Sequence, residues 1–387
     1  MAVEKVAVVG AGVAGLTAAL SFARRGIACD IFEETKELRE VGAGLQISPN
    51  ASRILHELGV LPALEAVWAE PERIALASGT SRRDLAHVPV GEFARKRWGA
   101  PYGVLHRATL QQVLLSAVEA DPLCSLHLGS PQRGDIAASI TAATGKSYPL
   151  VVGADGVWSR VREQVPGAPV ARFSGNVAWR FTVPDDDVPD WLPRDQVTAF
   201  LGPAAHLVAY PLKDTGGINL VAIASGISSA SVWDAKASDS QHRMLMAQLR
   251  GWDALLLRML ASAGRPTFWP LYQVSAGRWQ NGGDMVLIGD AAHAMMPFAA
   301  QGAAMAIEDA FALSARVSGT APLATALATF EAERGARIAR VRARGEFNRF
   351  AYHARGPIRI GRDLVLALKP PRSLAAEMDW LYGYRTP

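Results

Sequence analysis

The chain has 387 residues, of which half are apolar, a formal net charge of +4 and two cysteines. A chain of this length and composition can bury a large core in two or three domains, which is typical of a soluble globular protein. Two cysteines exclude a disulfide framework and a thiolate metal cluster, so the reducing cytoplasm is the expected location.

An apolar strand over residues 6–9 runs directly into a G-x-G-x-x-G turn formed by Gly10, Gly12 and Gly15. A helix over residues 16–23 follows without a break. In this arrangement Gly10 permits a tight turn, Gly12 lets the backbone approach a pyrophosphate and Gly15 lets the helix pack closely on the strand. The turn therefore predicts a dinucleotide site, and it argues against a membrane-spanning helix in this uncharged stretch.

A second apolar strand, residues 27–32, brings Glu33 to its end. A carboxylate about 20 residues after the glycines accepts hydrogen bonds from a ribose, but the pattern does not separate NAD, NADP and FAD. Further on, Gly42 and Gly44 flank a short apolar strand. Glycines so close together let a backbone pass near a ligand, whereas the alternative interpretation of residues 41–50 is a plain connector.

Two further stretches present polar groups next to predicted elements. Arg107 stands at the entrance of a helix predicted over residues 108–120. It is either an exposed charge near the helix cap or a cation folded over a bound phosphate or flavin. Later an apolar strand stops at Asp155 and Gly156, and Ser159 can begin a helix. An isolated Asp-Gly pair indicates only a turn, whereas at the end of a strand it also fits a ligand-facing turn.

Residues 170–275 have a different texture, with apolar alternation, several tryptophans and frequent prolines. This pattern predicts several strands that form a sheet inserted after the nucleotide-binding part, and we expect that sheet to cover a substrate. His206 and Tyr210 are four residues apart, so both point to one face of their predicted strand. From the spacing alone, two unrelated polar residues on a sheet face are the simpler interpretation.

A buried strand over residues 285–288 leads to Asp290, a position at which open α/β sheets place ligand-binding groups. The loop from Pro297 to Gly302 can present backbone N–H groups to a ring carbonyl, and a helix begins near Gly302. His293 has no second histidine or cysteine at ligand spacing, so we expect no metal site. The absence of G-x-S-x-G from the sequence argues against a serine hydrolase.

Arginines concentrate in residues 334–349. Such a stretch could contact nucleic acid. Because glutamates accompany it at helical spacings and the arginines do not alternate with aromatic residues in a repeated pattern, the sequence predicts a solvated helix face, with no nucleic-acid partner.

Taken together, the glycine turn with Glu33, the middle Asp155 and Gly156 and the late Asp290 resemble, in the same order, motifs of the FAD-dependent aromatic hydroxylases. These are single-component flavoprotein monooxygenases, and the resemblance covers nearly the whole chain, with most similarity to the salicylate and hydroxynicotinate hydroxylase branch. It implies an α/β fold in three parts. These are a discontinuous Rossmann-like FAD-binding domain at 1–169 and 276–330, an inserted mixed β-sheet substrate domain at 170–275 and a C-terminal helical segment at 331–387.

The resemblance also implies roles for individual residues. His206 and Tyr210 would face the substrate ring as the catalytic pair, and Gln46, Pro297 and Phe298 would contact the substrate. Gln46 and Phe298 stand where the hydroxynicotinate enzyme has histidines, which suggests a related but different ring. The residues implied to bind the cofactor are Gly10, Gly12, Gly15, Glu33, Gly44, Arg107, Asp155, Gly156, Asp290, Pro297, Gly302 and Ala303.

The implied reaction uses NADH or NADPH as co-substrate to reduce FAD, which then takes up O₂ to give a flavin C4a-hydroperoxide. This species hydroxylates a phenolic or hydroxypyridine carboxylic acid, with or without decarboxylation. The expected partners are a small aromatic substrate and O₂, without a membrane, and the chain would be a monomer or a homodimer. Two alternatives stay open: an FAD oxidoreductase that does not hydroxylate, and a flavin-binding regulator.

Overall fold

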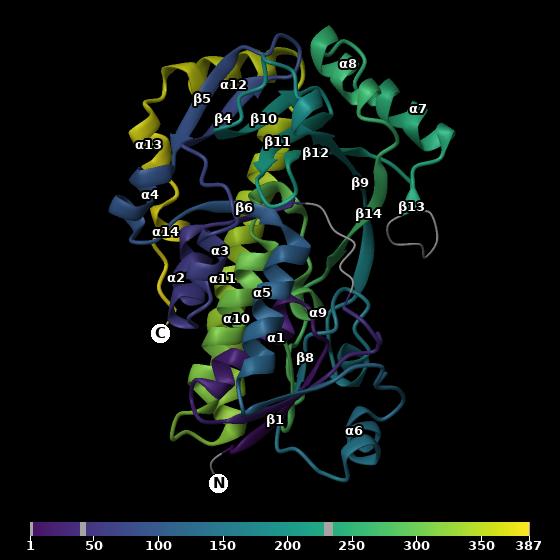
Figure 1. Cartoon of the computed structure of the whole chain (residues 1–387), viewed down its shortest axis with the longest axis vertical. Helices are drawn as coiled ribbons and strands as arrows, with labels where there is room; N and C mark the ends of the chain where they lie inside the picture. The colour runs from purple at the N-terminus through teal and green to yellow at the C-terminus, as the bar shows by residue number, and fades with distance from the viewer. Residues whose placement is uncertain (1–2, 39–43, 228–234, 387) are drawn as a thin grey trace.

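The structure is a computed structural model that describes residues 3–38, 44–227 and 235–386. Two large β-sheets lie in the lower and upper halves of Figure 1, and long helices connect the two halves. The expected α/β architecture, with one parallel sheet and one mixed sheet, is confirmed.

The first sheet has five parallel strands in the order β15-β8-β1-β2-β7. Its central strands are apolar and buried, because a parallel sheet is covered on both faces. The helix α1, which follows β1, packs against both α5 and α10. The elements are β1 (Lys5–Val9), α1 (Val13–Ala23), β2 (Ala28–Phe32), α5 (Arg107–Ala120), β7 (Cys124–His127), β8 (Val151–Gly153), β15 (Met285–Leu287) and α10 (Gly302–Val317).

The second sheet has eight strands in the order β13-β14-β9-β12-β11-β10-β4-β5. All neighbours in it are antiparallel except β10 and β4, which run parallel. One face packs against α7 and α8 through a separate apolar core. The elements are β4 (Arg73–Ser78), β5 (Asp84–Pro89), β9 (Ala171–Pro184), β10 (Gln196–Gly202), β11 (Ala205–Leu212), β12 (Gly217–Ser225), β13 (Ala235–Lys236), α7 (Asp239–Gln248), α8 (Ala254–Ser262) and β14 (Thr267–Val274).

The sheet therefore extends beyond the residues 170–275 that the sequence assigned to it. Strands β4 and β5, which lie far earlier in the chain, continue the sheet past β10. The physical reason is that an unpaired strand edge leaves a row of backbone N–H and C=O groups to satisfy. Strand β4 pairs with β10, and its apolar Ala75 and Ala77 are buried there. The hairpin of β4 and β5 thus satisfies the backbone groups along the edge of β10.

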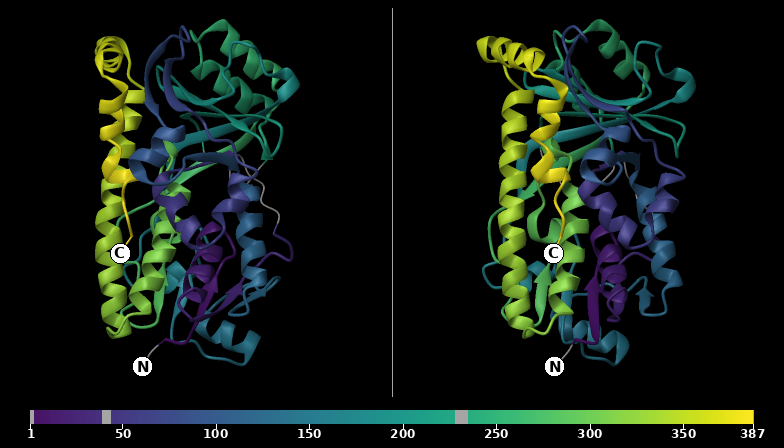
Figure 2. Two further views of the ribbon diagram at one scale, coloured as in Figure 1. Left: turned by 60° about the vertical axis from the view of Figure 1, so that its left-hand side comes forward. Right: turned by 90° about the vertical axis from the view of Figure 1, so that its left-hand side faces the viewer.

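The C-terminal part is helical, as expected from the sequence. Its first helix, α11, runs along most of the long axis of the molecule and packs on α10 (Figure 2). The prediction of a solvated face at residues 334–349 is wrong for Arg334 and Arg337, because their side chains pair with Glu308 of α10 and are only 1% and 6% exposed. The elements are α11 (Leu323–Tyr352), α12 (Gly356–Leu368), α13 (Pro371–Ala376) and α14 (Asp379–Tyr382).

Shorter elements connect these parts. Among the described residues, no helix combines the length and the apolar character that crossing a bilayer requires. The connecting elements are the antiparallel pair β3 (Gly44–Ile47) and β6 (Gly103–His106), the helices α2 (Pro49–Glu57), α3 (Leu61–Glu65), α4 (Gly91–Trp98), α6 (Ile136–Thr144) and α9 (Asp290–His293), and the 3-10 turns η1 (Val161–Gln164), η2 (Asp185–Asp187) and η3 (Pro297–Ala299).

Candidate functional site

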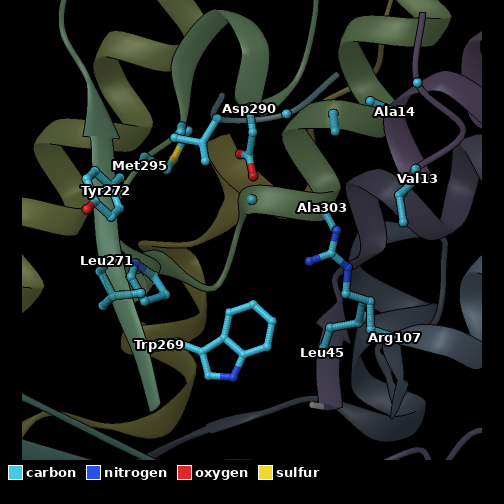
Figure 3. A pocket seen from close by; sticks show the side chains of 18 of the residues that line it. Val13, Ala14, Leu45, Arg107, Trp269, Leu271, Tyr272, Asp290, Met295 and Ala303 are labelled. Carbon is cyan, nitrogen blue, oxygen red and sulfur yellow. The ribbon is translucent and has the colours of Figure 1, made fainter. Parts of the chain in front are cut away.

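A cavity of about 670 Å³ lies between the two sheets (Figure 3). This volume is in the range of pockets that hold cofactors and small ligands. One end is formed by the glycine turn after β1 and by the start of α10. The other end is formed by side chains of β9, β11, β12 and β14 from the second sheet.

The glycine turn fits a bound phosphate. A Cβ atom on Gly10 or Gly15 would meet backbone oxygen at 2.6 Å or 1.9 Å, so these glycines serve packing within the protein. A Cβ atom on Gly12 would meet nothing within 4 Å, because Gly12 faces the cavity. No side chain caps the first turn of α1, which leaves its N–H groups available to an anion.

A second helix begins at the same cavity. Gly302 and Ala303 open α10 and line the cavity, and no side chain caps this helix either. A Cβ atom on Gly302 would likewise meet nothing within 4 Å. Two helix N-termini with positive dipole ends therefore face one cavity, which fits a ligand with several negative charges.

Charged side chains surround these helix ends. Glu33 accepts hydrogen bonds from the backbone N–H of Ala11 at 2.9 Å and of Thr35 at 3.0 Å, which hold its carboxylate at the cavity. A carboxylate has about four acceptor positions, so Glu33 can still accept from ribose hydroxyls. In Figure 3 the guanidinium of Arg107 and the carboxylate of Asp290 both point into the cavity. These groups suit the sugar and phosphate parts of a dinucleotide.

Asp155 and Gly156 form a turn at the cavity wall. Asp155 Oδ2 accepts hydrogen bonds from the N–H groups of Arg160 at 2.7 Å and Val161 at 3.2 Å. Burial raises the pKa of this carboxyl, and its Oδ1 atom is buried without a hydrogen-bond partner among the described residues. An orphaned buried acceptor is costly unless a ligand donates to it. The helix expected at Ser159 is only a 3-10 turn, η1.

The far end of the cavity contains His206 and Tyr210, both buried on β11. The Tyr210 ring packs against Gly44, where a Cβ atom would lie 2.5 Å from Tyr210 Cε2. Burial raises the pKa of Tyr210, so its hydroxyl stays protonated. His206 Nδ1 lies 2.9 Å from Nε2 of His353, which is at the end of α11. Both histidines are neutral near pH 7, because burial lowers the pKa of each.

We expect the folded chain to lose stability on acidification from pH 6.5 to about pH 4. Burial lowers the pKa of His353 from 6.5 to about 4, and burial followed by His353 itself lowers that of His206 well below 6.5. In this range the unfolded chain binds protons that the folded chain does not. For each of the two histidines, the free energy of unfolding therefore falls by up to about 1.4 kcal/mol for every pH unit of acidification. Urea unfolding across this range measures the slope. The same slope in a His206→Gln, His353→Gln double variant would contradict this origin.

Arg180 and Trp269 are among the lining residues that sequence reasoning missed. The Arg180 guanidinium on β9 lies 4.7 Å from the centre of the Trp269 ring on β14, and both side chains line the cavity. Strand alternation offered a partial signal for Arg180, because Arg180 points to the face of β9 away from that of its fully buried neighbour Trp179. It does not say which face of the sheet meets the cavity, and that depends on the other strands.

Most residues expected from the sequence come together here. Two do not line the cavity: Gly15 is inside the turn, and Phe298 lies behind His206, with the two ring centres 5.2 Å apart. Among the described residues, no cluster of His, Cys, Asp and Glu is arranged to hold a metal ion. The expected residues that line the cavity are Gly10, Gly12, Glu33, Gly44, Gln46, Arg107, Asp155, Gly156, His206, Tyr210, Asp290, Pro297, Gly302 and Ala303.

A buried ionic cluster joins α10 to α11 beside the cavity. Arg334 donates from Nη1 to Glu308 Oε2 at 2.7 Å and from Nε to Asp309 Oδ1 at 2.8 Å. Arg337 donates to both oxygens of Glu308, at 3.1 Å and 2.9 Å. Each buried charge thus has an opposite charge in contact, which offsets the cost of removing it from water.

The ionic cluster also holds two segments that end at the cavity. Asn50 Nδ2 donates to Glu308 Oε1 at 2.7 Å and to Gln301 Oε1 at 3.2 Å, and Gln301 directly precedes α10. Asp309 Oδ2 accepts from the backbone N–H of Gly289 at 3.0 Å, just after β15. Sequence reasoning missed this cluster, because a glutamate and an aspartate inside a helix are usually solvated.

Comparison with known proteins agrees with a cavity that binds a dinucleotide. The family described as "FAD binding domain" matches residues 4–344. The chain is similar to 3-hydroxybenzoate 6-hydroxylase 1 of Aquipseudomonas alcaligenes, with 31% identity over 99% of this chain and 98% of the relative. It is 35% identical to 3-amino-4-hydroxybenzoate 2-monooxygenase of Streptomyces cremeus, over 98% and 95% of the two chains. A crystal structure of Klebsiella pneumoniae HpxO complexed with FAD and uric acid has the same fold, with a TM-score of 0.79 and 23% identity over 97% of this chain and 95% of that one.

Proposed function

This chain belongs to the FAD-binding family of flavoprotein aromatic monooxygenases, and from that premise we propose that it hydroxylates a phenolic or hydroxypyridine carboxylic acid. NADH or NADPH is the proposed electron donor and O₂ the source of the added oxygen. The resemblance noted in the sequence is confirmed at the level of the family, whereas the identity of the ring is part of the proposal.

The features of the glycine-turn end of the cavity support the binding of FAD at that end. We place the pyrophosphate of FAD at the first turn of α1 beside Gly12, and the ribose of FAD at Glu33. Arg107 and Asp290 would then contact the rest of the FAD molecule. When bound and reduced, FAD supplies the oxygen activation that hydroxylation requires. The chain itself contributes binding, orientation and exclusion of water.

The observation that carries the proposal is the pair of His206 and Tyr210 at the opposite end. A neutral histidine can accept the proton of a substrate hydroxyl group, which makes the ring more electron-rich. A protonated Tyr210 can donate a hydrogen bond to the resulting oxygen. Both side chains line the same cavity as the glycine turn, so one bound ring can meet the cofactor and the base together.

The remaining walls suit a flat ring that carries a carboxylate. Val208, Val221 and Ile223 give the wall an apolar surface, and Trp269 adds an aromatic face. Arg180 is a cation on the same wall, and a guanidinium pairs with a carboxylate through two parallel hydrogen bonds. These groups favour a hydroxylated aromatic acid over a neutral ring.

The test is NADH and NADPH consumption by the FAD-loaded protein with a panel of hydroxylated benzoates and hydroxypyridine carboxylates, with product masses determined. Consumption stimulated by one ring, with one oxygen atom added to that ring, is the expected result. Stimulated consumption that yields only hydrogen peroxide for every ring would favour an oxidoreductase that does not hydroxylate. Bound flavin without stimulated consumption would favour a flavin-binding regulator.

We expect His206→Ala to lower the hydroxylation rate about a hundredfold near pH 7, the lower end of what general base catalysis contributes. The loss should shrink at high pH, where the substrate ionises without a base. Product formation across a pH series measures both effects. His242→Ala is the matched control, because His242 lies on α7 and does not line the cavity. A pH-independent loss would assign His206 to packing instead.

A further inference from the structure

His206 is sealed from water on the side away from the cavity. Its side chain is 1% exposed. Its ring centre lies 5.2 Å from that of Phe298, 5.4 Å from that of Tyr352 and 5.1 Å from that of His353. On this side, a proton that His206 takes from a bound ring therefore cannot pass from His206 directly to bulk water, and a turnover cycle must return His206 to its neutral state.

The contact between the two histidines offers a path. His206 Nδ1 and His353 Nε2 are 2.9 Å apart, which is a hydrogen-bond distance. In a neutral imidazole one nitrogen donates and the other accepts. If His206 donates from Nδ1 to His353, its Nε2 atom is the nitrogen that accepts a proton, and Nδ1 of His353 carries the next one.

His353 stands at the border between this buried site and the surface. It caps the C-terminal end of α11, and its backbone oxygen accepts a hydrogen bond from the N–H of Ala204, 3.5 Å away, in the loop between β10 and β11. Unlike His206, His353 is a partly exposed residue. Burial first, then Arg349 and Arg355, lower its pKa to about 4, so it passes a proton on and does not hold it.

The other titratable groups near the pair stay protonated and do not compete for the proton. Tyr210, on the same strand as His206, has a pKa raised by burial. Burial also raises the pKa of Tyr352, which packs edge-on against the His206 ring. Among the described residues at this end of the cavity, the two neutral imidazoles are thus groups that can accept a proton near pH 7.

We propose that His353 relays the proton of the substrate hydroxyl group from His206 to water. The hydroxyl proton moves to His206 Nε2, the proton on His206 Nδ1 moves to His353 Nε2, and the proton on His353 Nδ1 leaves to solvent. Both rings end neutral with their tautomers exchanged, and the substrate becomes a phenolate. The inference rests on the proposed function of His206; His353 acts through His206 and does not touch the substrate.

The experiment measures proton release when the FAD-loaded, oxidised protein binds a ring without any electron donor. The protein is mixed in a stopped-flow instrument with each ring of the panel, 3-hydroxybenzoate first, in weak buffer with a pH indicator. His353→Gln keeps a side-chain amide that can hydrogen-bond to His206 but cannot carry a proton. We expect it to slow proton release about a hundredfold, as His206→Ala does, while the Kd of the ring changes by less than about threefold.

Chemical rescue separates a relay from a structural role. His353→Ala leaves space beside His206, and added imidazole is expected to restore most of its rate of proton release. His242→Gln, the matched control on α7, should release protons at the wild-type rate. A slow His353→Gln together with a His353→Ala that imidazole does not rescue would make His353 structural and overturn the relay.

The outcomes also separate this inference from the function on which it rests. If His206→Ala releases the proton slowly while His353→Gln releases it at the wild-type rate, the relay is overturned and the role of His206 stays intact. Wild-type release from His206→Ala, or no release from the wild-type protein with any ring, would overturn both.

Discussion

Arg334→Ala is expected to lower the free energy of unfolding by about 3–5 kcal/mol, the cost of removing one partner from a buried ion pair. Arg334 is 1% exposed and contacts two carboxylates that are inaccessible to solvent. Burial opposes its charge, yet Glu308 and Asp309 raise its pKa, so it is charged at every working pH. The substitution leaves Asp309 without its guanidinium partner in the core, and Arg337 is then the one guanidinium of this cluster that still pairs with Glu308, beside the hydrogen bond from Asn50.

Urea unfolding of the apo-protein measures this loss. Arg349→Ala is the matched control on the same helix, because Arg349 is exposed, and it should change stability by no more than about 0.5 kcal/mol. Adding Asp309→Ala to Arg334→Ala should cost less than the sum of the single changes, since the two side chains share one interaction. Equal effects of Arg334→Ala and Arg349→Ala would show that the ionic cluster contributes nothing to stability.

The second prediction with a large effect contrasts two glycines of one turn. Gly12→Ala should leave the stability of the apo-protein almost unchanged, because its Cβ atom has open space and φ is −75°. That methyl group would occupy the path of a pyrophosphate. Loss of two charge-assisted hydrogen bonds of about 1.5–3 kcal/mol each would weaken FAD binding by about 10²–10⁴-fold.

Gly15→Ala should behave in the opposite way. Its Cβ atom would lie 1.9 Å from the backbone oxygen of Gly10, so the strand and helix must separate before any ligand binds. We expect little folded protein, or an apo-protein several kcal/mol less stable. Urea unfolding of both apo-proteins and FAD titration by flavin fluorescence distinguish the two variants. A Gly12→Ala protein that binds FAD as the wild type does would move the pyrophosphate away from this turn.

Several parts of the site could be predicted from short stretches of sequence. The strand, turn and helix around Gly10, Gly12 and Gly15 form as expected, because neighbouring residues satisfy one another within a few positions. Asp155 and Asp290 stand at the ends of apolar strands, and a parallel sheet brings such ends to one edge. The sequence by itself thus determined the nucleotide-binding half of the cavity and the family to which the chain belongs.

Only the tertiary structure decided the features that depend on pairing over long distances. His206 meets His353 across 147 positions, and Arg334 turns inward to acids 25 and 26 positions away. Strands β4 and β5 join a sheet whose other strands come much later in the chain. Periodicity along the chain shows that a residue lies on a face, but the rotation of α11 and the order of the strands determine what that face meets. Those depend on packing between distant segments, which no local pattern records.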